Sequence, residues 1–390
     1  MDLAQLQLRQ AALARHDGRC VVFGATMHGW RSQPVAAEVL ETFEAVHGVQ
    51  LPAQYRTWLA TVGVGAGPFY GLMPPTEDLE DARPGRPFPH TATYDGGDLP
   101  LGADAVDGTV RLSDQGCGYC DLLVLNGPHA GEVWVDFREA EGPITPWYPD
   151  FAHWLAAWLV RSEAEWAVEA LGDGEVEAEP AFLATARAAV EAVVADGGDP
   201  MLAQYPIGAD KLHRVRAQLF LQDGVLEAAE AAFEQAAACS SEPGAVRALG
   251  QCAVARARGD EAARLAAAQA GLATPGVWWS SKKQLLSEQA LALEGLARWD
   301  EAFDARVALA RHDARNLHAR YDVAWICLLR EDAPMAAAWL VEAAQAGVGC
   351  EGLPEGERLA AVAAGLLDAL RGSGHEDRAD LLEAALGSVV

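Results

Sequence analysis

Cys117 and Cys120 form a C-x-x-C pair, a spacing that occurs in zinc sites and in thiol–disulfide redox motifs. Zinc would need two further ligands at suitable spacing, and His90, His129 and His153 follow no such pattern. A redox pair would need its first cysteine at the start of a helix in a βαβ unit, whereas this pair lies in a predicted turn before a strand. We favour a packed turn, with metal binding or redox chemistry as the alternatives.

Three carboxylates flank the predicted strands around this pair. Asp114, Asp121 and Asp136 could act as an acid–base pair only if two of them faced one cleft, roughly 5–10 Å apart. Solvated strand ends are the simpler interpretation. Ser113 has no nucleophile-elbow context, so a hydrolase triad has no support in the sequence.

A glycine-rich segment, residues 63–72, resembles a phosphate-binding loop only superficially. No lysine follows the glycines, and Pro68 and Tyr70 stand where a phosphate-binding helix would begin. We expect instead a backbone that needs positive φ angles at several positions, among them Gly67 and Gly71.

Composition narrows the classes of partner. The chain has 390 residues, 29 Lys and Arg against 56 Asp and Glu, a net charge of −27 and 51% hydrophobic residues. Such an acidic surface disfavours nucleic acid and anionic membranes, because both require Lys and Arg. Small molecules or other proteins, basic ones in particular, are the expected partners. The sequence predicts no cofactor.

Several features predict a cytoplasmic protein. The chain contains no run of about 18 apolar residues, so no membrane-spanning helix is expected. Its first residues lack the basic and apolar regions of a signal peptide. The seven cysteines are scattered and odd in number, which is not the pattern of a disulfide framework.

The sequence changes texture along its length. The first part is rich in Gly, Pro and Trp and the last part in Ala, Leu and Glu, with a short acidic stretch between them. We predict an N-terminal extension at 1–33, an α+β domain at 34–165, an acidic linker at 166–180 and an all-α helical solenoid at 181–390. Periodicity in the α+β domain predicts helices at 35–47 and 51–62, strands at 109–112, 122–125 and 132–136, and a helix after Asp150. This order favours an antiparallel sheet with flanking helices.

Four segments of this domain, taken in order, resemble the SUKH superfamily of the Smi/Knr cell-wall-regulator type. They are residues 51–56, 67–72, 114–134 and 151–159. The resemblance covers residues 34–160 and implies an α+β domain that binds proteins rather than one that catalyses a reaction. Bacterial members are typically immunity proteins against secreted toxins, and fungal relatives regulate cell-wall assembly. Cys120 departs from the hydrophobic or aromatic residue expected there. The structural motif positions are Gly67, Pro68, Gly71, Gly116, Cys117, Gly118, Gly127 and Gly131.

Aromatic residues supply the candidate contact surface. Tyr70, Trp134 and Trp147, together with Asp114, are the predicted partner-binding residues, because interfaces favour Trp and Tyr. The tryptophans on apolar helix faces are assigned to the core: Trp58, Trp154 and Trp158. Trp278 and Trp279, in the last part of the chain, are expected to fill a gap between helices.

A small residue recurs near the start of successive predicted helices in the last part. The recurring positions are Ala228, Ala262, Ala302, Ala336 and Ala379, with steps of 34, 40, 34 and 43 residues. Paired helices at this period are typical of a solenoid, and the pattern resembles a degenerate tetratricopeptide-type array of about five repeats.

The expected function is non-catalytic protein binding. The first hypothesis is a bacterial immunity-type protein that masks a secreted polymorphic toxin, with a basic toxin domain as the partner. The second is a scaffold or regulator of the cell envelope or stress response that acts through the helical repeats. A metal or redox enzyme that uses Cys117 and Cys120 is the least favoured alternative.

Overall fold

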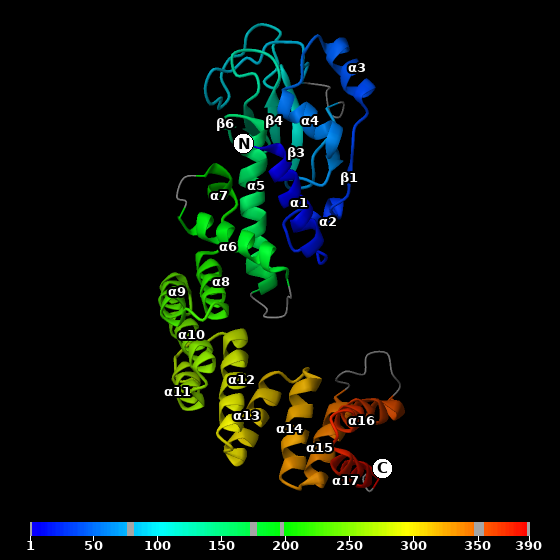
Figure 1. The fold of residues 1–390 in the computed structure, drawn as a ribbon, viewed down its shortest axis with the longest axis vertical. Coiled ribbons are helices and arrows are strands. Elements are labelled where there is room, and N and C mark those ends of the chain that lie inside the picture. The colour runs from blue at the N-terminus through cyan, green and yellow to red at the C-terminus, as the bar shows by residue number, and fades with distance from the viewer. Residues whose placement is uncertain (1, 76–81, 172–177, 196–198, 347–354, 388–390) are drawn as a thin grey trace. The chain divides into compact units, whose positions relative to one another are not determined.

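The computed structural model describes residues 2–75, 82–171, 178–195, 199–346 and 355–387 (Figure 1). Contacts within the chain divide it into two compact units, Met1–Arg216 and Ala217–Val390. The first unit has a small antiparallel sheet with helices around it, and the second is a run of helices that pack in sequence-adjacent pairs. The predicted fold class is therefore confirmed. Within the described residues, no helix is long and apolar enough to cross a membrane.

The first unit contains most of the irregular structure. Its elements are α1 (Leu3–His16), α2 (Ala25–His28), β1 (Ser32–Gln33), α3 (Ala37–His47), α4 (Ala53–Thr61), β2 (Val64–Gly65), β3 (Thr109–Gly116), β4 (Tyr119–Val124), β5 (Val133–Asp136), η1 (Arg138–Ala140), β6 (Ile144–Tyr148), α5 (Phe151–Trp166), η2 (Ala167–Leu171), α6 (Pro180–Ala195) and α7 (Pro200–Gln204). The predicted helices and strands of this region are all present, with boundaries shifted by a few residues.

The main sheet is an antiparallel meander in the order β3–β4–β5–β6. Leu123 on β4 pairs with Val110 on β3 and Val133 on β5, and all three side chains are fully buried. Strand β6 is an addition to the predicted set. It contains Pro146, which has no N–H to donate to a ladder, and it lies at the sheet edge where that loss is tolerated.

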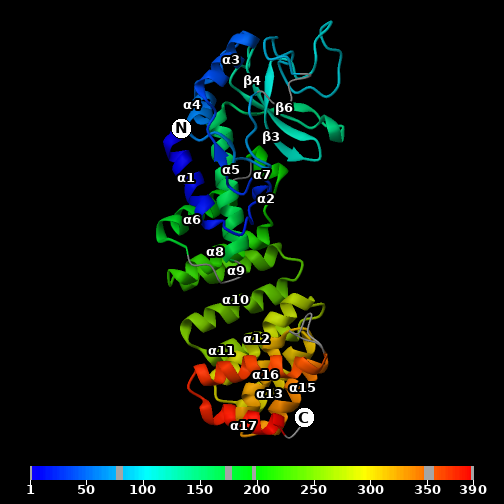
Figure 2. The same cartoon turned by 90° about the vertical axis from the view of Figure 1, so that its right-hand side faces the viewer.

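Helix α5 is the central support of the first unit (Figure 2). Its N-cap Asp150 accepts a hydrogen bond from the backbone N–H of His153 at 2.9 Å, as a capping residue should. Trp154 and Trp158 on this helix are 0% and 1% exposed, which confirms their predicted place in the core. The helix packs against α1, α4 and α6. Segments from the beginning and from the end of the first unit's sequence therefore contact the same helix.

The N-terminal segment belongs to this unit instead of preceding it as an extension. Arg9 on α1 forms an ion pair with the buried Glu163 on α5, with Nη2 and Oε2 2.6 Å apart. The indole N–H of Trp166 donates to the carbonyl of His16 at 3.2 Å. These contacts cover the face of α5 that a domain beginning at residue 34 would leave in solvent.

The division between the units lies later than the predicted linker at 166–180. Residues 167–171 continue helix α5 as a π-helical turn with Ala167, Val168 and Leu171 buried. Phe182 on α6 stacks on His16, with ring centroids 4.2 Å apart. The middle of the predicted linker, residues 172–177, lies outside the described part. The sequence expectation is corrected because α6 and α7 pack on the first unit, although their composition resembles that of the solenoid.

The second unit begins within α8 (Ala209–Gln222) and consists of helices. They are α9 (Leu226–Cys239), α10 (Pro243–Arg258), α11 (Glu261–Leu272), α12 (Trp279–Gly295), α13 (Trp299–His312), α14 (Leu317–Leu329), α15 (Ala333–Gln345), α16 (Glu355–Gly372) and α17 (Glu376–Gly387). Three of the recurring alanines, Ala302, Ala336 and Ala379, are fully buried where helices meet. Ala228 is half-buried and Ala262 exposed, so the packing role holds for the later helices only.

Candidate functional site

An aromatic patch on the first unit contains one of the predicted partner-binding residues. We define the aromatic patch as Phe23, Tyr70 and Tyr205. Phe23 is 37% exposed and Tyr70 39%. The ring of Phe23 lies 6.0 Å from that of Tyr70 and 6.0 Å from that of Tyr205, measured between centroids. Three loops far apart in the sequence thus place rings side by side on the surface, an arrangement suited to binding another protein.

The glycine-rich segment positions Tyr70 through a tight turn. The N–H of Gly71 donates to the carbonyl of Pro68 at 2.9 Å, and Gly65 and Leu72 exchange two backbone hydrogen bonds of 2.8 Å behind the turn. Gly71 has φ +113°, and a Cβ there would lie 2.3 Å from the carbonyl oxygen of Gly65. The turn therefore buries Phe69 and directs Tyr70 outward. Gly67 precedes it, close to the backbone of Leu72.

The β3–β4 hairpin supports Tyr70 from below. Cys117 and Gly118 have φ angles of +54° and +79°, which is the backbone of a two-residue type I′ turn. The N–H of Tyr70 donates to the carbonyl of Asp114 at 3.1 Å, and the Asp114 carboxylate accepts from the N–H of Gly116 at 2.6 Å. Asp114 therefore shapes the turn on which Tyr70 rests.

The C-x-x-C pair is this hairpin turn, in agreement with the favoured interpretation. Cys117 is exposed and Cys120 is buried, and both are free thiols. Burial raises the pKa of Cys120 to about 12, so its thiol stays protonated and is a poor nucleophile at neutral pH. Across the described ranges, no group of three or more His, Cys, Asp or Glu side chains lies close enough to hold a metal ion.

The histidines considered as zinc ligands lie in separate environments. His90 is buried and hydrogen-bonds the carbonyl of Ala105, with Nε2 and O 2.7 Å apart. His129 pairs with Glu132. His153 pairs with Asp150 at the start of α5. None of these contacts joins a histidine to the C-x-x-C pair.

The three strand carboxylates do not lie on one face of the sheet. The register pairs Cys120 with both Asp114 and Asp136, whereas Asp121, the next residue, points to the opposite face of the sheet. The Asp136 carboxylate accepts hydrogen bonds from the backbone N–H and the guanidinium of Arg138, among them one of 2.7 Å from Nη2. These carboxylates serve local structure in the sheet.

Asp121 is the centre of a buried polar network beneath the aromatic patch. Its carboxylate accepts hydrogen bonds from the hydroxyl of Ser113 and, at 2.8 Å, from the side-chain amide of Gln115. The amide oxygen of Gln115 in turn accepts from the hydroxyl of Tyr205 at 2.6 Å. Burial raises the pKa of Asp121 to about 7. The network therefore anchors one ring of the aromatic patch to the sheet.

Trp134 is not a surface residue, which corrects the sequence prediction. It is fully buried in a cluster with Phe88, and the two rings meet edge to face with centroids 4.8 Å apart. Its indole N–H donates to Glu132 at 3.0 Å, so even its polar atom is satisfied. Trp147 is half-buried on the edge strand β6, beside Phe137. Of the predicted aromatic contacts, only Tyr70 lies in the patch.

The two remaining motif glycines belong to the other end of the β4 strand. Gly127 and Gly131 have φ angles of +110° and +98° in the turn between β4 and β5. The N–H of Gly131 donates to the carbonyl of Val124 at 2.8 Å, which closes the turn. They shape the sheet without contributing to the aromatic patch.

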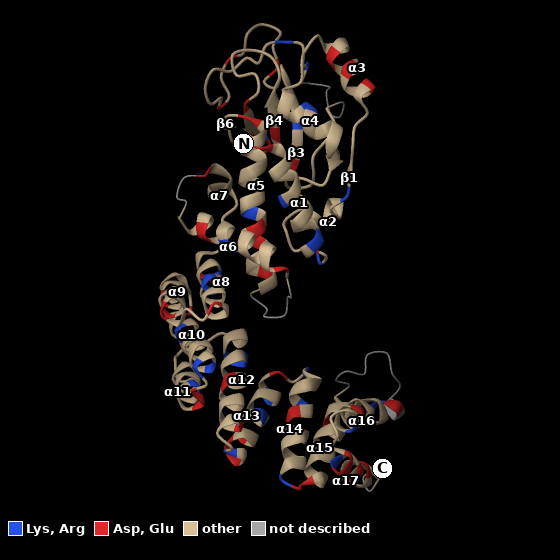
Figure 3. Ribbon diagram, viewed as in Figure 1, with Lys and Arg blue, Asp and Glu red and all other residues tan. Residues whose placement is uncertain are grey.

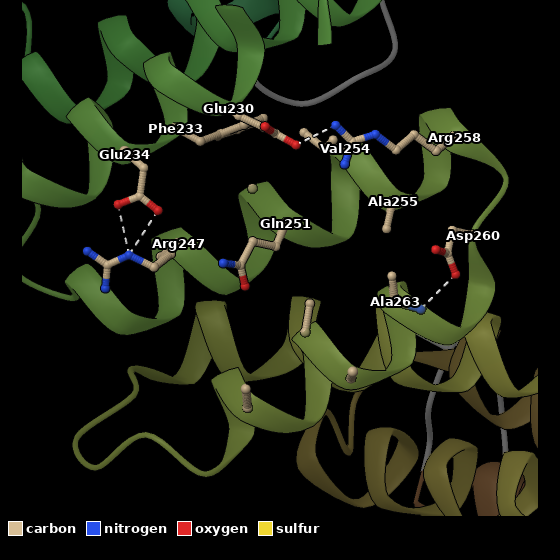
Figure 4. A pocket seen from close by; sticks show the side chains of 14 residues that line it. Glu230, Phe233, Glu234, Arg247, Gln251, Val254, Ala255, Arg258, Asp260 and Ala263 are labelled. Carbon is tan, nitrogen blue, oxygen red and sulfur yellow. Dashed lines mark hydrogen bonds and ion pairs between the residues drawn. The ribbon is translucent and has the colours of Figure 1, made fainter. Parts of the chain in front are cut away.

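A second candidate site is a groove in the helical unit, which we call the α9–α11 groove (Figure 4). It has a volume of about 670 Å³, with helix α10 between α9 and α11. Its apolar surface comes from Phe233, Val254 and Ala267. Exposed residues of α11, such as Ala266, also line it. Small residues on α11 leave room for an inserted side chain.

Two exposed ion pairs line the polar edge of this groove. Glu230 pairs with Arg258, with their charged atoms 2.7 Å apart, and Glu234 pairs with Arg247 at 2.9 Å. Both pairs join α9 to α10, and both are exposed. Their opposite charges cancel locally, so the groove selects for shape and apolar contact more than for charge.

Comparisons with protein-family models, with curated proteins and with solved structures found no match to this chain. The case for a function therefore depends on the residues and on the geometry described above. Two surfaces are available for it, the aromatic patch of the first unit and the α9–α11 groove of the second.

Sequence reasoning missed two of the three residues of the aromatic patch. Phe23 lies in the segment treated as an extension, and Tyr205 in the segment assigned to the solenoid. The only sequence signal near either is Tyr205-Pro206, because a residue before proline favours an extended or turn conformation that ends a helix. That signal locates a loop but not the place where the loop packs.

Proposed function

We propose that this chain is a non-catalytic protein-binding protein of the immunity type, which binds and masks a basic toxin domain in the cytoplasm. The observation that carries the proposal is the aromatic patch. Phe23 and Tyr70 are exposed and Tyr205 is half-buried, and hydrogen bonds hold both Tyr205 and the hairpin that contacts Tyr70, so little ordering is needed when a partner binds. The SUKH-like segments include both the turn that carries Tyr70 and the hairpin that supports it.

The charge of the chain supports a basic partner. Acidic residues are spread over both units (Figure 3), and they outnumber basic ones by 56 to 29. Complementary charge accelerates encounter and discriminates against acidic competitors more than it adds affinity. A toxin domain that acts on nucleic acid needs Lys and Arg to bind phosphates, so its surface is basic. Such a surface is complementary to the acidic surface of this chain.

Calorimetry with the full chain tests the proposal. The probe is the basic toxin domain that the proposal expects to be encoded beside the gene for this chain. We expect one-to-one binding that weakens as salt is added, and at least tenfold weaker binding for Tyr70→Ala. Val46→Ala is the matched control, because Val46 is 72% exposed on α3 and lies outside the aromatic patch. Equal affinity for Tyr70→Ala and the parent chain would overturn the assignment to the patch.

The α9–α11 groove favours the second candidate, a scaffold that acts through its helical unit. A bulky Ala266→Trp substitution would occupy the groove without touching the first unit. If the scaffold function is correct, this variant loses its partner and Tyr70→Ala retains it. The immunity function predicts the reverse pattern.

A further inference from the structure

Two neighbouring tryptophans at the start of α12 are exposed, contrary to the expectation that they fill a gap between helices. Trp278 is 61% exposed and Trp279 54%. Large aromatic side chains gain favourable free energy when they leave water, and tryptophan is enriched where proteins bind one another. The pair is therefore a candidate docking point that neither proposed function uses.

Trp279 is held in a fixed orientation. Its ring stacks on His312 with centroids 5.4 Å apart, and its indole N–H donates to the carbonyl of His312 at 3.2 Å. The ammonium group of Lys283 lies 5.6 Å from the centre of the same ring. These contacts make Trp279 a rigid platform that loses little side-chain entropy when a partner covers it.

Trp278 is anchored through its backbone only. Its N–H donates to the carboxylate of Glu242 at 2.6 Å, and Ser281 occupies the other oxygen of that carboxylate at 3.2 Å. Within the part of the chain that the structure describes, the indole ring of Trp278 has no ring contact or hydrogen bond. It is therefore free to insert between the side chains of a partner.

Positive charge accompanies the pair in an otherwise acidic chain. The chain has three lysines, and two of them, Lys282 and Lys283, lie after the tryptophans with Ser280 and Ser281 between. Lys283 is neutralised by Asp313, with the charged atoms 2.7 Å apart. Lys282 is exposed, and no carboxylate of a described residue lies within ion-pair distance of it. The Glu242 carboxylate keeps its negative charge, and it accepts hydrogen bonds from the backbone N–H of Trp278 and the hydroxyl of Ser281.

We propose that Trp278, Trp279 and Lys282 form a docking site for an acidic peptide segment that carries an aromatic or aliphatic anchor. The anchor packs on the exposed indole rings, and a carboxylate pairs with Lys282. At physiological salt, charges more than about 8 Å away are largely screened, so the local lysine outweighs the distant acidic surface. A single unpaired lysine is not the continuous basic groove that a single-stranded nucleic acid needs, which favours a peptide.

Fluorescence anisotropy with the full chain tests this site. The probe is a labelled 15-residue peptide that is rich in Glu and has one central Phe. We expect saturable binding that weakens with salt and at least tenfold loss for Trp278→Ala and for Lys282→Glu. The same peptide with Gln in place of Glu should bind at least tenfold more weakly. Trp299→Ala is the matched control, because Trp299 is 40% exposed at the start of α13, and it should bind like the parent chain.

Three results would overturn the proposal: equal binding by Trp278→Ala and the parent chain, equal binding of the Glu and Gln peptides, or tighter binding of an oligouridylate than of the acidic peptide. Circular dichroism of each variant confirms that the fold is retained. The test is independent of toxin binding, because its variants lie outside the aromatic patch and the toxin assay does not use them.

Discussion

The hydroxyl of Tyr205 donates a hydrogen bond of 2.6 Å to the side chain of Gln115, which lies 90 residues earlier in the chain. Gln115 passes the connection to Asp121 through its amide N–H, at 2.8 Å. The loop after α7 is thereby fastened to the β3–β4 hairpin, which also accepts a hydrogen bond from the backbone of Tyr70. Tyr70 and Tyr205 both contact the β3–β4 hairpin, so substitutions in the hairpin or its polar network should shift these two rings.

Removal of the Tyr205 hydroxyl should destabilise the first unit. In Tyr205→Phe the amide oxygen of Gln115, which is 3% exposed, loses its donor, and an unsatisfied buried acceptor costs about 1–3 kcal/mol. Urea denaturation followed by tryptophan fluorescence measures the change. Tyr94→Phe is the control, because the hydroxyl of Tyr94 bonds an exposed carbonyl that water can satisfy. Equal losses in the two variants would contradict a special role for the buried network.

Asp121 should make stability depend on pH in the direction opposite to that of most carboxylates. Burial raises its folded-state pKa to about 7, so folding favours the protonated form. This stabilisation is complete below the unfolded pKa of about 4 and is lost as the pH rises through about 7. Relative to Asp121→Asn, the parent chain should lose on the order of a few kcal/mol between pH 4 and pH 8. A constant difference in unfolding free energy across that range would refute the buried carboxylate.

Asp150 provides a control of opposite sign. Burial opposes its ionisation, but hydrogen bonds from the backbone and side chain of His153 outweigh that effect and lower its pKa. Its contribution to stability is therefore present above its unfolded pKa and lost as the pH falls. The pH profile of Asp150→Asn against the parent chain should slope the other way from that of Asp121→Asn.

The sequence was sufficient for local structure. Apolar spacing located α3, α4 and α5, short strand-like runs located β3 to β5, and the capping role of Asp150 was readable from its place before an apolar run. Strand β6 was missed because Pro146 argues against a strand unless the strand is known to lie at an edge. Trp134 was misplaced for a related reason: alternation separates the two faces of a strand, but it does not show that both faces of β5 are covered.

Long-range packing was beyond the sequence. The aromatic patch combines residues from the loop after α1, the glycine-rich turn and the loop after α7. No local sequence pattern indicates that these three loops lie together. The acidic stretch after α5 suggested a domain boundary, yet the segment beyond it returns to pack on the same unit. Trp278 and Trp279 lie at the start of α12, and the flanking sequence carries no signal of their exposure.

Gly116→Ala should damage the support of Tyr70. Gly116 has φ +88°, which costs a residue with a Cβ about 1–2 kcal/mol, and its Cβ would lie 2.7 Å from the hydroxyl of Tyr70. Gly131→Ala meets the same backbone penalty at φ +98° but has no atom within 4 Å. We therefore expect Gly116→Ala to lose about 1 kcal/mol more in thermal or urea unfolding, because Tyr70 must also move. Equal losses would show that Tyr70 is not held against the hairpin.

Gly250→Ala should change the α9–α11 groove. A Cβ at Gly250 would lie 2.5 Å from the ring of Phe233, so the ring must shift, at a cost of about 1–3 kcal/mol for overpacking. Gly372→Ala, at the end of α16 with no atom within 4 Å, should be neutral or stabilising by up to about 1 kcal/mol. Calorimetric melting of both variants makes the comparison. A stabilised Gly250→Ala would show that Phe233 does not pack as described.

Growth of bacteria that co-express this chain with the toxin that the proposal expects beside its gene tests the account most directly. The parent chain should restore growth, Val46→Ala should restore it equally, and a Phe23→Ser/Tyr70→Ser double variant with unchanged thermal stability should fail. Full rescue by the double variant, or no rescue by the parent chain, would contradict protein masking through the aromatic patch.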